Sequence, residues 1–223
     1  MQEYAVPVYR TARYALLGEP TGPVEEVWMV CHGYGQLASY FLRPFREIEA
    51  PHRLIVAPEG LSRFYLDDGS GTHHRVGASW MTREGREAEI DDYVRFLDAV
   101  YTDVLTRAGR VHVRLTALGF SQGGATVTRW LARSPALARP PADRLILWGS
   151  LLPHDLDLAA HRTWLNDTAL TLVVGTEDEY ATPERVAEEE ARLRAAGVDH
   201  RTVRFDGGHR IDADELRRLA AGG

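Results

Sequence analysis

Short runs of Val, Ile and Leu constrain the fold of this chain more than any other feature of its sequence. These runs span 26–32, 53–57, 111–118, 144–149, 169–175 and 200–205. Most of them do not alternate with polar residues, and such density is typical of strands buried on both faces of a sheet. We therefore expect each run to form a strand of a parallel sheet that is covered on both sides.

Helical patterns separate the predicted strands. They cover 38–49, which is interrupted at Pro44, and 86–105, 124–133, 182–197 and 212–220. This alternation predicts an α/β fold with a mostly parallel central sheet and helices on both faces. The first 25 residues predict a two-stranded hairpin at the sheet edge. Because no repeat or linker-like stretch interrupts the chain, we expect residues 1–223 to form a single domain.

The residue types present exclude several chemistries. All 26 basic residues are Arg, so a P-loop lysine, a Schiff-base lysine and a Ser-Lys dyad are excluded. Cys31 is the only cysteine, which rules out an internal disulfide and a cysteine metal cluster. His73 and His74 lack a partner at metal-ligand spacing. We therefore expect neither a metal nor a cofactor.

Charge and hydropathy indicate where the protein acts. The net charge of −6 argues against a nucleic-acid partner. No run of the sequence reaches the roughly 18 apolar residues of a membrane span. The first residues, MQEYAVPVYR, lack the apolar core of a signal peptide. We expect a cytoplasmic protein without a membrane partner. The oligomeric state stays open, a homodimer included.

The stretch Gly119-Phe120-Ser121-Gln122-Gly123 lies between a predicted strand and a predicted helix. It fits the pattern Gly-x-Ser-x-Gly, in which a tight turn holds a serine in a strained conformation above the sheet. The flanking glycines fit because a Cβ there would collide with the facing chain. Ser121 is therefore the candidate nucleophile. The alternative, a serine that only caps a helix, does not account for the two glycines.

A serine nucleophile needs a general base and an acid that orients the base. His209 follows the last predicted strand and is the candidate base. Asp178 follows the strand at 169–175 and is the candidate acid, with Glu177 as the alternative. His154 is the main rival to His209, but it precedes the acid, whereas this motif orders its triad as Ser, acid, His.

Attack on an ester carbonyl also needs N–H donors for the developing oxyanion. The residue after the nucleophile, Gln122, supplies one backbone N–H at a helix N-terminus. The glycine-rich loop His32-Gly33-Tyr34-Gly35 follows the first central strand. The backbone N–H of Tyr34 in this loop is the second candidate donor.

The motifs CHGYG, GFSQGG, GTEDEYATP and DGGH occur in this order. They resemble the α/β-hydrolase fold, and within it most closely the small phospholipase/carboxylesterase family, which includes the acyl-protein thioesterases. The resemblance runs from about residue 25 to the end. It implies triad roles for Ser121, Asp178 and His209 and oxyanion roles for Tyr34 and Gln122. The stretch GASW resembles the family's SWFD, but Met81 and Thr82 replace its Phe and Asp.

The sequence therefore predicts a serine carboxylesterase that hydrolyses small or short-acyl esters through an acyl-enzyme on Ser121. An acyl-thioesterase or lysophospholipase is the alternative, and a non-catalytic hydrolase-like binding module is a further one. The connection between the strands at 144–149 and 169–175 has about 20 residues, which is short for a large lid.

The long segment 58–85 supplies the candidate substrate-binding residues, because long loops within a compact domain are often functional. These candidates are Phe64, Tyr65, Trp80 and Met81. Their alternative role is to anchor the loop. The basic side chains Arg63, His73, His74 and Arg75 of the same segment favour an anionic substrate weakly.

Overall fold

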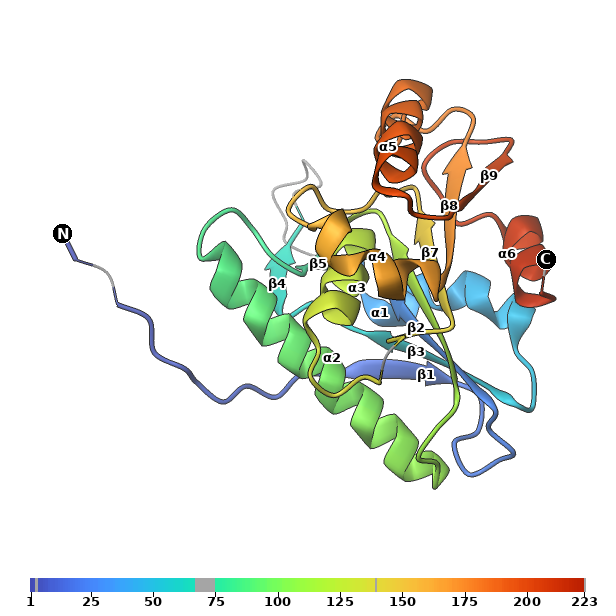
Figure 1. The fold of residues 1–223 in the computed structure, drawn as a ribbon. Coiled ribbons are helices and arrows are strands. Elements are labelled where there is room, and N and C mark those ends of the chain that lie inside the picture. Colours follow the sequence, from blue (N-terminus) through green and yellow to red (C-terminus); the bar gives the residue numbers. More distant parts are fainter. Residues whose placement is uncertain (3, 67–74, 139, 223) are drawn as a thin grey trace.

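A single mixed sheet forms the centre of the computed structural model, which describes residues 1–2, 4–66, 75–138 and 140–222 (Figure 1). The strand order is β1-β3-β2-β6-β7-β8-β9. All neighbouring strands are parallel except β1, which pairs with β3 in the antiparallel direction. The strands are β1 (Tyr14–Leu17), β2 (Glu26–Cys31), β3 (Arg53–Pro58), β6 (Arg114–Phe120), β7 (Arg144–Trp148), β8 (Ala169–Gly175) and β9 (Arg201–Phe205).

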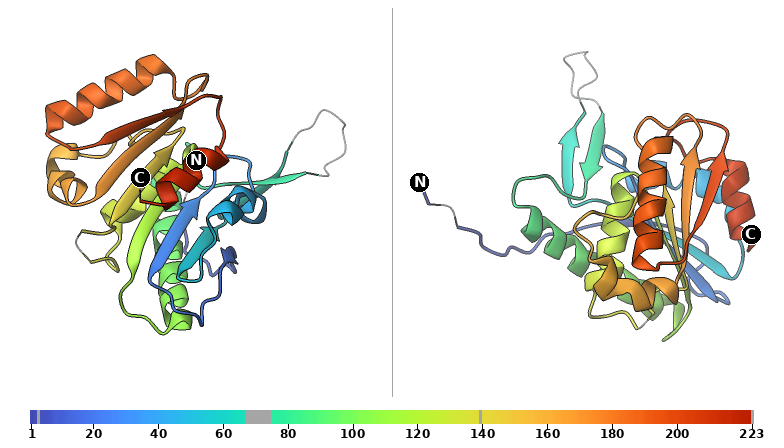
Figure 2. Two further views of the ribbon diagram at one scale, coloured as in Figure 1. Left: turned by 90° about the vertical axis from the view of Figure 1, so that its right-hand side faces the viewer. Right: turned by 45° about the horizontal axis from the view of Figure 1, so that its top comes forward.

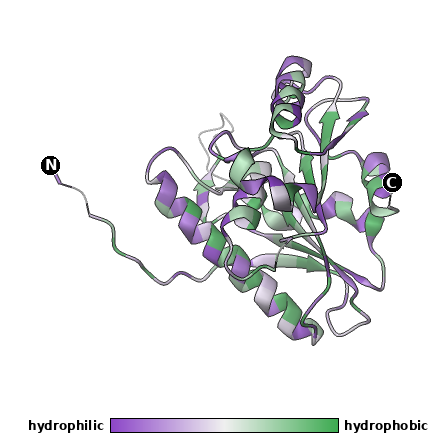
Figure 3. Ribbon diagram, viewed as in Figure 1, coloured by the Kyte–Doolittle hydropathy of each residue, from purple (hydrophilic) through white to green (hydrophobic). Residues whose placement is uncertain are grey.

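Helices cover both faces of this sheet (Figures 1 and 2). Residues Val27 and Met29 of β2 pack in one apolar cluster with α2, α3 and α4, whereas Trp28 and Val30 pack in a second cluster with α1, η1 and α6. In Figure 3 the strands are mostly hydrophobic, and α2 carries residues of both kinds. The helices are α1 (Ala38–Phe41), the 3-10 helix η1 (Arg43–Ile48), α2 (Arg86–Ala108), α3 (Gln122–Arg133), α4 (Leu158–Asn166), α5 (Pro183–Ala196) and α6 (Ala213–Ala220).

The predicted parallel sheet with helices on both faces is confirmed. The helix α5 was predictable because both of its ends carry clear sequence signals. The Thr182 hydroxyl accepts a hydrogen bond from the N–H of Arg185, and Pro183 occupies the first helical position. Gly197 ends the helix in the left-handed conformation, at a φ of 66°.

The predicted hairpin in the first 25 residues is wrong. Among the described residues of this segment only β1 is a strand, and its partner is β3, a strand nearly 40 residues further along the chain. Residues before β1 extend away from the body (Figure 1). The predicted interruption of the helical segment 38–49 at Pro44 is confirmed, because the chain forms α1 and then η1, with Pro44 in the first turn of η1. Proline cannot donate the N–H that a continuous α-helix would need at this position.

Three elements were not predicted at all. The segment 58–85 contains a second, two-stranded sheet of β4 (Ser62–Tyr65) and β5 (Val76–Ser79), which projects from the body in Figure 2. The connection between β7 and β8 contains α4, whose Trp164 and Leu165 are buried in the core. This helix is thus part of the packed structure and not a lid.

The loops with the candidate site residues all lie at the carboxyl ends of strands in the central sheet. They follow the carboxyl ends of β2, β6, β8 and β9, which run parallel, and ligands of open α/β sheets bind at this end. Separately, the described part of the chain contains no helix with the length and apolar character needed to span a bilayer.

A buried ion pair joins two strands at the opposite, amino-terminal end of the sheet. Glu26 and Arg53 begin the neighbouring strands β2 and β3, and the two side chains are 8% and 9% exposed and in direct contact. The Arg53 guanidinium also donates to the carbonyl oxygens of Ile48 (2.6 Å) and Ala220 (3.0 Å). Arg53 therefore ties β3 to η1 and to the end of α6.

Replacing Glu26 with Ala leaves the Arg53 guanidinium buried without a counter-ion, so we expect a loss of about 3–5 kcal/mol in the free energy of unfolding. Urea denaturation measures this loss. The double variant Glu26→Leu/Arg53→Met is the matched control and should lose less, because it removes both charges. A larger loss in the double variant than in the single one would contradict this account.

Candidate active site

Ser121 has the most unusual backbone conformation in the described chain. Its φ of 53° is the only positive value at a described residue other than glycine, and its ψ is −120°. Such a conformation costs about 1–3 kcal/mol and persists only where the surroundings hold it. The N–H of Ser121 donates to the carbonyl oxygen of Trp148 at 2.9 Å, and its own carbonyl oxygen accepts from Gly124 at 3.0 Å. The strand-to-helix turn is therefore fixed from both sides.

Glycines make this turn possible because the chain crosses itself closely. A Cβ at Gly119 would overlap the backbone of Gly123, and a Cβ at Gly123 would overlap the carbonyl oxygen of Cys31. The Cys31 thiol is itself buried in β2, where burial raises its pKa. The strand-to-helix turn at Ser121, which we call the elbow, carries a serine, whereas Cys31 lies in the neighbouring strand.

His209 and Asp178 form a hydrogen-bonded pair. His209 Nδ1 lies 2.8 Å from Asp178 Oδ2, and the two side chains are 15% and 1% exposed. Asp178 Oδ1 accepts from the N–H groups of Tyr180 (2.8 Å) and Ala181 (2.9 Å). Glu177, the alternative acid, is exposed.

The hydrogen bonds of Asp178 keep its carboxylate ionised. Burial alone would raise the pKa of Asp178, but the donors of Ala181, His209 and Tyr180 outweigh burial and hold the pKa below its ordinary value. The carboxylate on Nδ1 favours the tautomer in which Nδ1 carries the proton, which leaves Nε2 free to accept one.

Two rings and a glycine surround the His209 imidazole. The ring of Phe120, the residue before Ser121, lies 4.7 Å from it between centroids, and the ring of Tyr180 lies at 4.6 Å. A Cβ at Gly149 would come within 2.8 Å of the imidazole atoms Cε1 and Nδ1. Gly149 directly follows Trp148, which holds Ser121, so these contacts place the His–Asp pair beside the serine turn.

The loop between β2 and α1 leaves one amide available. Gly33 donates its N–H to Gln36 Oε1 (2.8 Å), and Gly35 donates to the carbonyl oxygen of Ala78 (2.9 Å). Among the described residues, the Tyr34 N–H has no hydrogen-bond acceptor. A Cβ at Gly33 would lie 3.2 Å from Ser121 Cβ, so this loop passes close to the serine.

His32 is a buried, neutral side chain that holds this loop in place through hydrogen bonds. Its Nε2 accepts from the N–H of Gly60 (2.9 Å), so Nδ1 carries the proton and donates to the carbonyl oxygen of Gly33 (2.8 Å). Burial lowers the pKa of His32, which favours the uncharged form. The Trp80 ring packs at 4.9 Å from the imidazole, and its indole N–H donates to the His32 carbonyl oxygen at 2.8 Å.

Gln122 contributes through both its backbone and its side chain. It is the first residue of α3, where a backbone N–H has no intrahelical acceptor and the helix dipole is positive. Its side-chain amide donates to the carbonyl oxygen of Met81 (2.9 Å) and accepts from the N–H of Trp80 (3.1 Å). The sequence indicated only the backbone role, because nothing in the motif shows what the side chain contacts.

A small pocket of about 220 Å³ opens at Ser121. Its walls come from the loop after β7 and from the start of the α5 region. The lining residues are Ser121, Gly149, Ser150, Leu151, Leu152, Pro153, His154, Tyr180, Ala181 and Arg185. His154, the predicted rival base, is exposed at this lining, whereas His209 makes the contact with Asp178.

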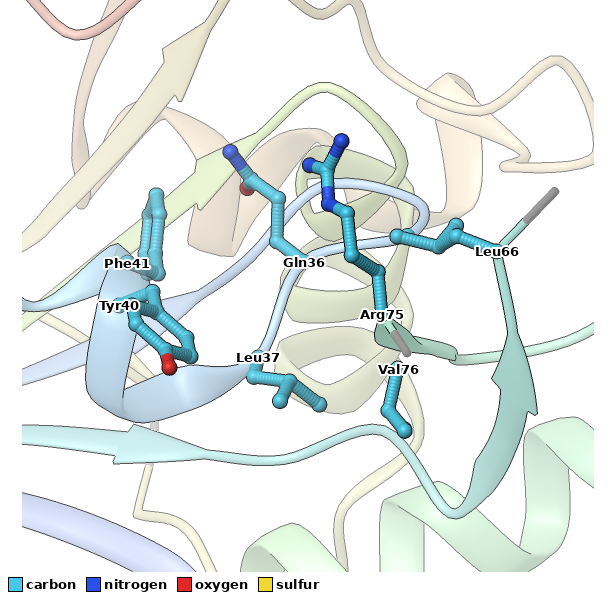
Figure 4. A pocket seen from close by; sticks show the side chains of 8 residues that line it. Gln36, Leu37, Tyr40, Phe41, Leu66, Arg75 and Val76 are labelled. Atoms are coloured by element: carbon cyan, nitrogen blue, oxygen red, sulfur yellow. The ribbon is translucent and has the colours of Figure 1, made fainter. Parts of the chain in front are cut away.

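A larger pocket of about 590 Å³ is lined by the residues that follow Tyr34 and by α1. Figure 4 shows the side chains of Gln36 and Arg75 extending side by side between Leu66 and the α1 residues Tyr40 and Phe41. Of the basic residues predicted in segment 58–85, His73 and His74 lie outside the described residues.

The four predicted substrate-binding residues do not belong to the described lining of the pocket at Ser121. Trp80 is 1% exposed and packs beneath His32, so it supports the loop. The Met81 carbonyl oxygen accepts from Gln122, as described above. Phe64 packs against the Tyr34 ring at 5.1 Å, and Tyr65 is 63% exposed.

Asp155 fixes the wall of the small pocket to two helices, a role that the sequence did not indicate. Its carboxylate accepts from Arg129 of α3 at 2.7 and 3.1 Å, and it pairs with Arg86 of α2 at 3.1 Å. The Arg129 hydrogen bonds hold the pKa of Asp155 well below its ordinary value, against the opposing effect of burial.

Among the described residues, no cluster of three His, Cys, Asp or Glu side chains could hold a metal ion.

The strained serine turn, the His–Asp pair and the open parallel sheet define a serine hydrolase with the α/β-hydrolase fold. Residues 13–221 match the sequence model of the phospholipase/carboxylesterase family, and the chain therefore belongs to this family. It is an enzyme that hydrolyses carboxylic esters, and the resemblance predicted from the motifs is confirmed. No curated protein matches the sequence significantly.

Several solved structures share the fold. Esterase PE8 is 19% identical, with a TM-score of 0.68 over 96% of this chain and 98% of that one. A carboxylesterase from Mesorhizobium loti is 23% identical, with a TM-score of 0.69 over 95% of each chain. Zea mays acyl-protein thioesterase 2 is 14% identical, with a TM-score of 0.69 over 95% and 97%. At these identities the likeness concerns the fold.

The Asp155 ion pairs predict how the stability of the protein falls at low pH. A carboxylate whose folded pKa is depressed stabilises the protein above its unfolded pKa of about 3.9, and this contribution is lost as the pH falls toward the folded pKa. We expect Asp155→Asn to be less stable than the wild type at pH 7, and the difference to shrink below about pH 4. Urea denaturation between pH 7 and pH 3 measures it. A difference that stays constant over this range would contradict the depressed pKa.

Proposed function

We propose that the protein is a serine carboxylesterase that cleaves small or short-acyl esters through an acyl-enzyme on Ser121. The contact of His209 with the buried Asp178, beside the strained turn of Ser121, carries this proposal. No metal or cofactor is needed. We infer that the reaction takes place in a single-domain cytoplasmic enzyme, as the sequence predicts.

In the first half-reaction Ser121 Oγ attacks the ester carbonyl carbon while His209 Nε2 takes the hydroxyl proton. The carbonyl electron pair moves to its oxygen, and the N–H groups of Tyr34 and Gln122 stabilise that oxyanion. The electron pair on the oxyanion then re-forms the carbonyl, and the bond to the leaving oxygen breaks, with its electrons departing on the alkoxide. His209 returns its proton to this leaving oxygen, so a neutral alcohol departs.

In the second half-reaction water attacks the acyl-enzyme and gives its proton to the same nitrogen of His209. The second oxyanion collapses, Ser121 Oγ leaves with the proton, and the carboxylic acid is released. Asp178 remains ionised throughout, holds the imidazole tautomer and stabilises the imidazolium. Its depressed pKa supports this role.

The size of the pocket at Ser121 supports short acyl groups. Ligand pockets for drug-sized molecules measure about 300–1,000 Å³, and 220 Å³ is smaller. A pocket of this size favours a short acyl chain, whereas a long acyl chain needs a further channel.

An acyl-thioesterase or lysophospholipase is the second candidate function. The larger pocket favours it, because Leu37, Phe41, Leu66 and Val76 offer apolar surface beside the Tyr34 loop. The fold likeness to the Zea mays acyl-protein thioesterase also favours it. A non-catalytic binding module is disfavoured, because all three candidate triad residues are present.

We expect Ser121→Ala to abolish turnover of 4-nitrophenyl butyrate, because no other group can form the acyl-enzyme, with a loss of at least about 10³-fold. The matched control is Ser62→Ala on β4, which lies away from the turn and should keep its activity. Mass spectrometry of the fluorophosphonate-treated wild type should show one adduct on Ser121. Retained activity in Ser121→Ala would rule out the proposed mechanism.

Chain length separates the two candidate functions. With 4-nitrophenyl esters from acetate to decanoate, we expect kcat/KM to be highest at two to about five carbons, because the pocket at Ser121 is small. Acyl-thioesters of the same lengths test the leaving group in parallel. A maximum at eight carbons or more would favour the thioesterase or lysophospholipase function.

A further inference from the structure

The pocket at Ser121 contains a single formal charge among its described lining residues, the guanidinium of Arg185. Arg185 belongs to the first turn of α5, and its Nη1 donates to the carbonyl oxygen of Tyr180 at 2.8 Å. One N–H of the five is thereby used within the protein. The remaining donors are available to a ligand.

Arg185 has no carboxylate within ion-pair distance among the described residues, although acidic side chains surround it in sequence. The nearby buried carboxylates have other partners. Asp178 binds His209 at 2.8 Å, and Glu189 binds Arg192 at 3.0 Å. Asp155, on the loop across the pocket, binds Arg129 and Arg86. The charge of Arg185 is therefore not neutralised by a direct contact.

The position of Arg185 relates it directly to the reacting groups. Its partner Tyr180 packs its ring against the His209 imidazole at 4.6 Å. Ser121 and Arg185 line the same pocket, together with the uncharged residues Leu151, Pro153 and Ala181. A substrate with its ester at Ser121 therefore lies in a pocket that also contains an unpaired cation.

We propose that Arg185 binds an anionic group, such as a carboxylate, that the ester substrate carries a few atoms from the scissile bond. This inference rests on the proposed ester hydrolysis at Ser121 and names its substrate class. The planar guanidinium offers paired donors to a carboxylate. The carboxylate sits on the acyl half, as in a half-ester of a dicarboxylic acid, or on the alcohol half.

Two matched pairs of esters distinguish these sources. Mono-4-nitrophenyl glutarate and 4-nitrophenyl pentanoate have acyl chains of equal length, and only the first carries a carboxylate on the acyl half. The pair 4-(butyryloxy)benzoate and its methyl ester differs by a carboxylate on the leaving group. For each pair, the ratio of kcat/KM for the anionic ester to kcat/KM for the neutral ester is measured in wild type, Arg185→Met and Arg185→Lys.

We expect the ratio for one pair to fall at least about tenfold in Arg185→Met, as for the loss of one charge-assisted hydrogen bond. In Arg185→Lys this ratio should fall less, because lysine keeps the positive charge but lacks the paired N–H donors of the planar guanidinium. The control Arg194→Met changes an exposed arginine near the other end of α5 and should leave both ratios unchanged. The pair that responds identifies the half of the substrate that carries the charge.

Two further results would overturn the inference in distinguishable ways. Turnover of the neutral esters with both ratios unchanged in Arg185→Met would refute the role of Arg185 and leave the esterase function standing. Absence of turnover for all four esters, together with no fluorophosphonate adduct on Ser121, would refute the esterase function itself.

Discussion

The structure of the site depends on one steric constraint, the close crossing of two backbones where α3 begins. Gly123 lies against the carbonyl oxygen of Cys31, and Gly119 lies against Gly123, with no room for a Cβ at either glycine. This crossing forces the chain to turn within one residue, and that residue is Ser121. The same contact brings the end of β2, and with it the Tyr34 loop, next to the serine. The strained backbone, the candidate nucleophile and the candidate oxyanion donors thus share one cause.

The candidate oxyanion donors are held by groups that carry no charge of their own. Neutral His32 joins the Tyr34 loop to Gly60, and Trp80 packs against it, while the Gln122 side chain joins α3 to Trp80 and Met81. Neutral, buried supports keep these dipoles fixed before substrate arrives, which is the condition for strong electrostatic stabilisation.

Local sequence predicted the parallel sheet, the elbow at Ser121 and the order of the loops that carry Asp178 and His209, because each depends on residues close together in the chain. The role of Trp80 could not be predicted in this way. A tryptophan in a long segment fits a pocket wall and a core position equally well, and its contact with His32 spans 48 residues. The same reason applies to β1, whose partner is distant, and to Asp155, whose partner Arg129 lies on another element.

The tight surroundings of His209 have a consequence for the order of events. Phe120 and Tyr180 pack beside the ring, and Asp178 holds its Nδ1. In the proposed reaction the other nitrogen, Nε2, therefore serves both the departing alcohol and the incoming water, which occupy the same space in succession. An alcohol that lingers there excludes water and can retake the acyl group. In the proposed reaction, abundant small alcohols would thus compete with water and convert hydrolysis into ester exchange.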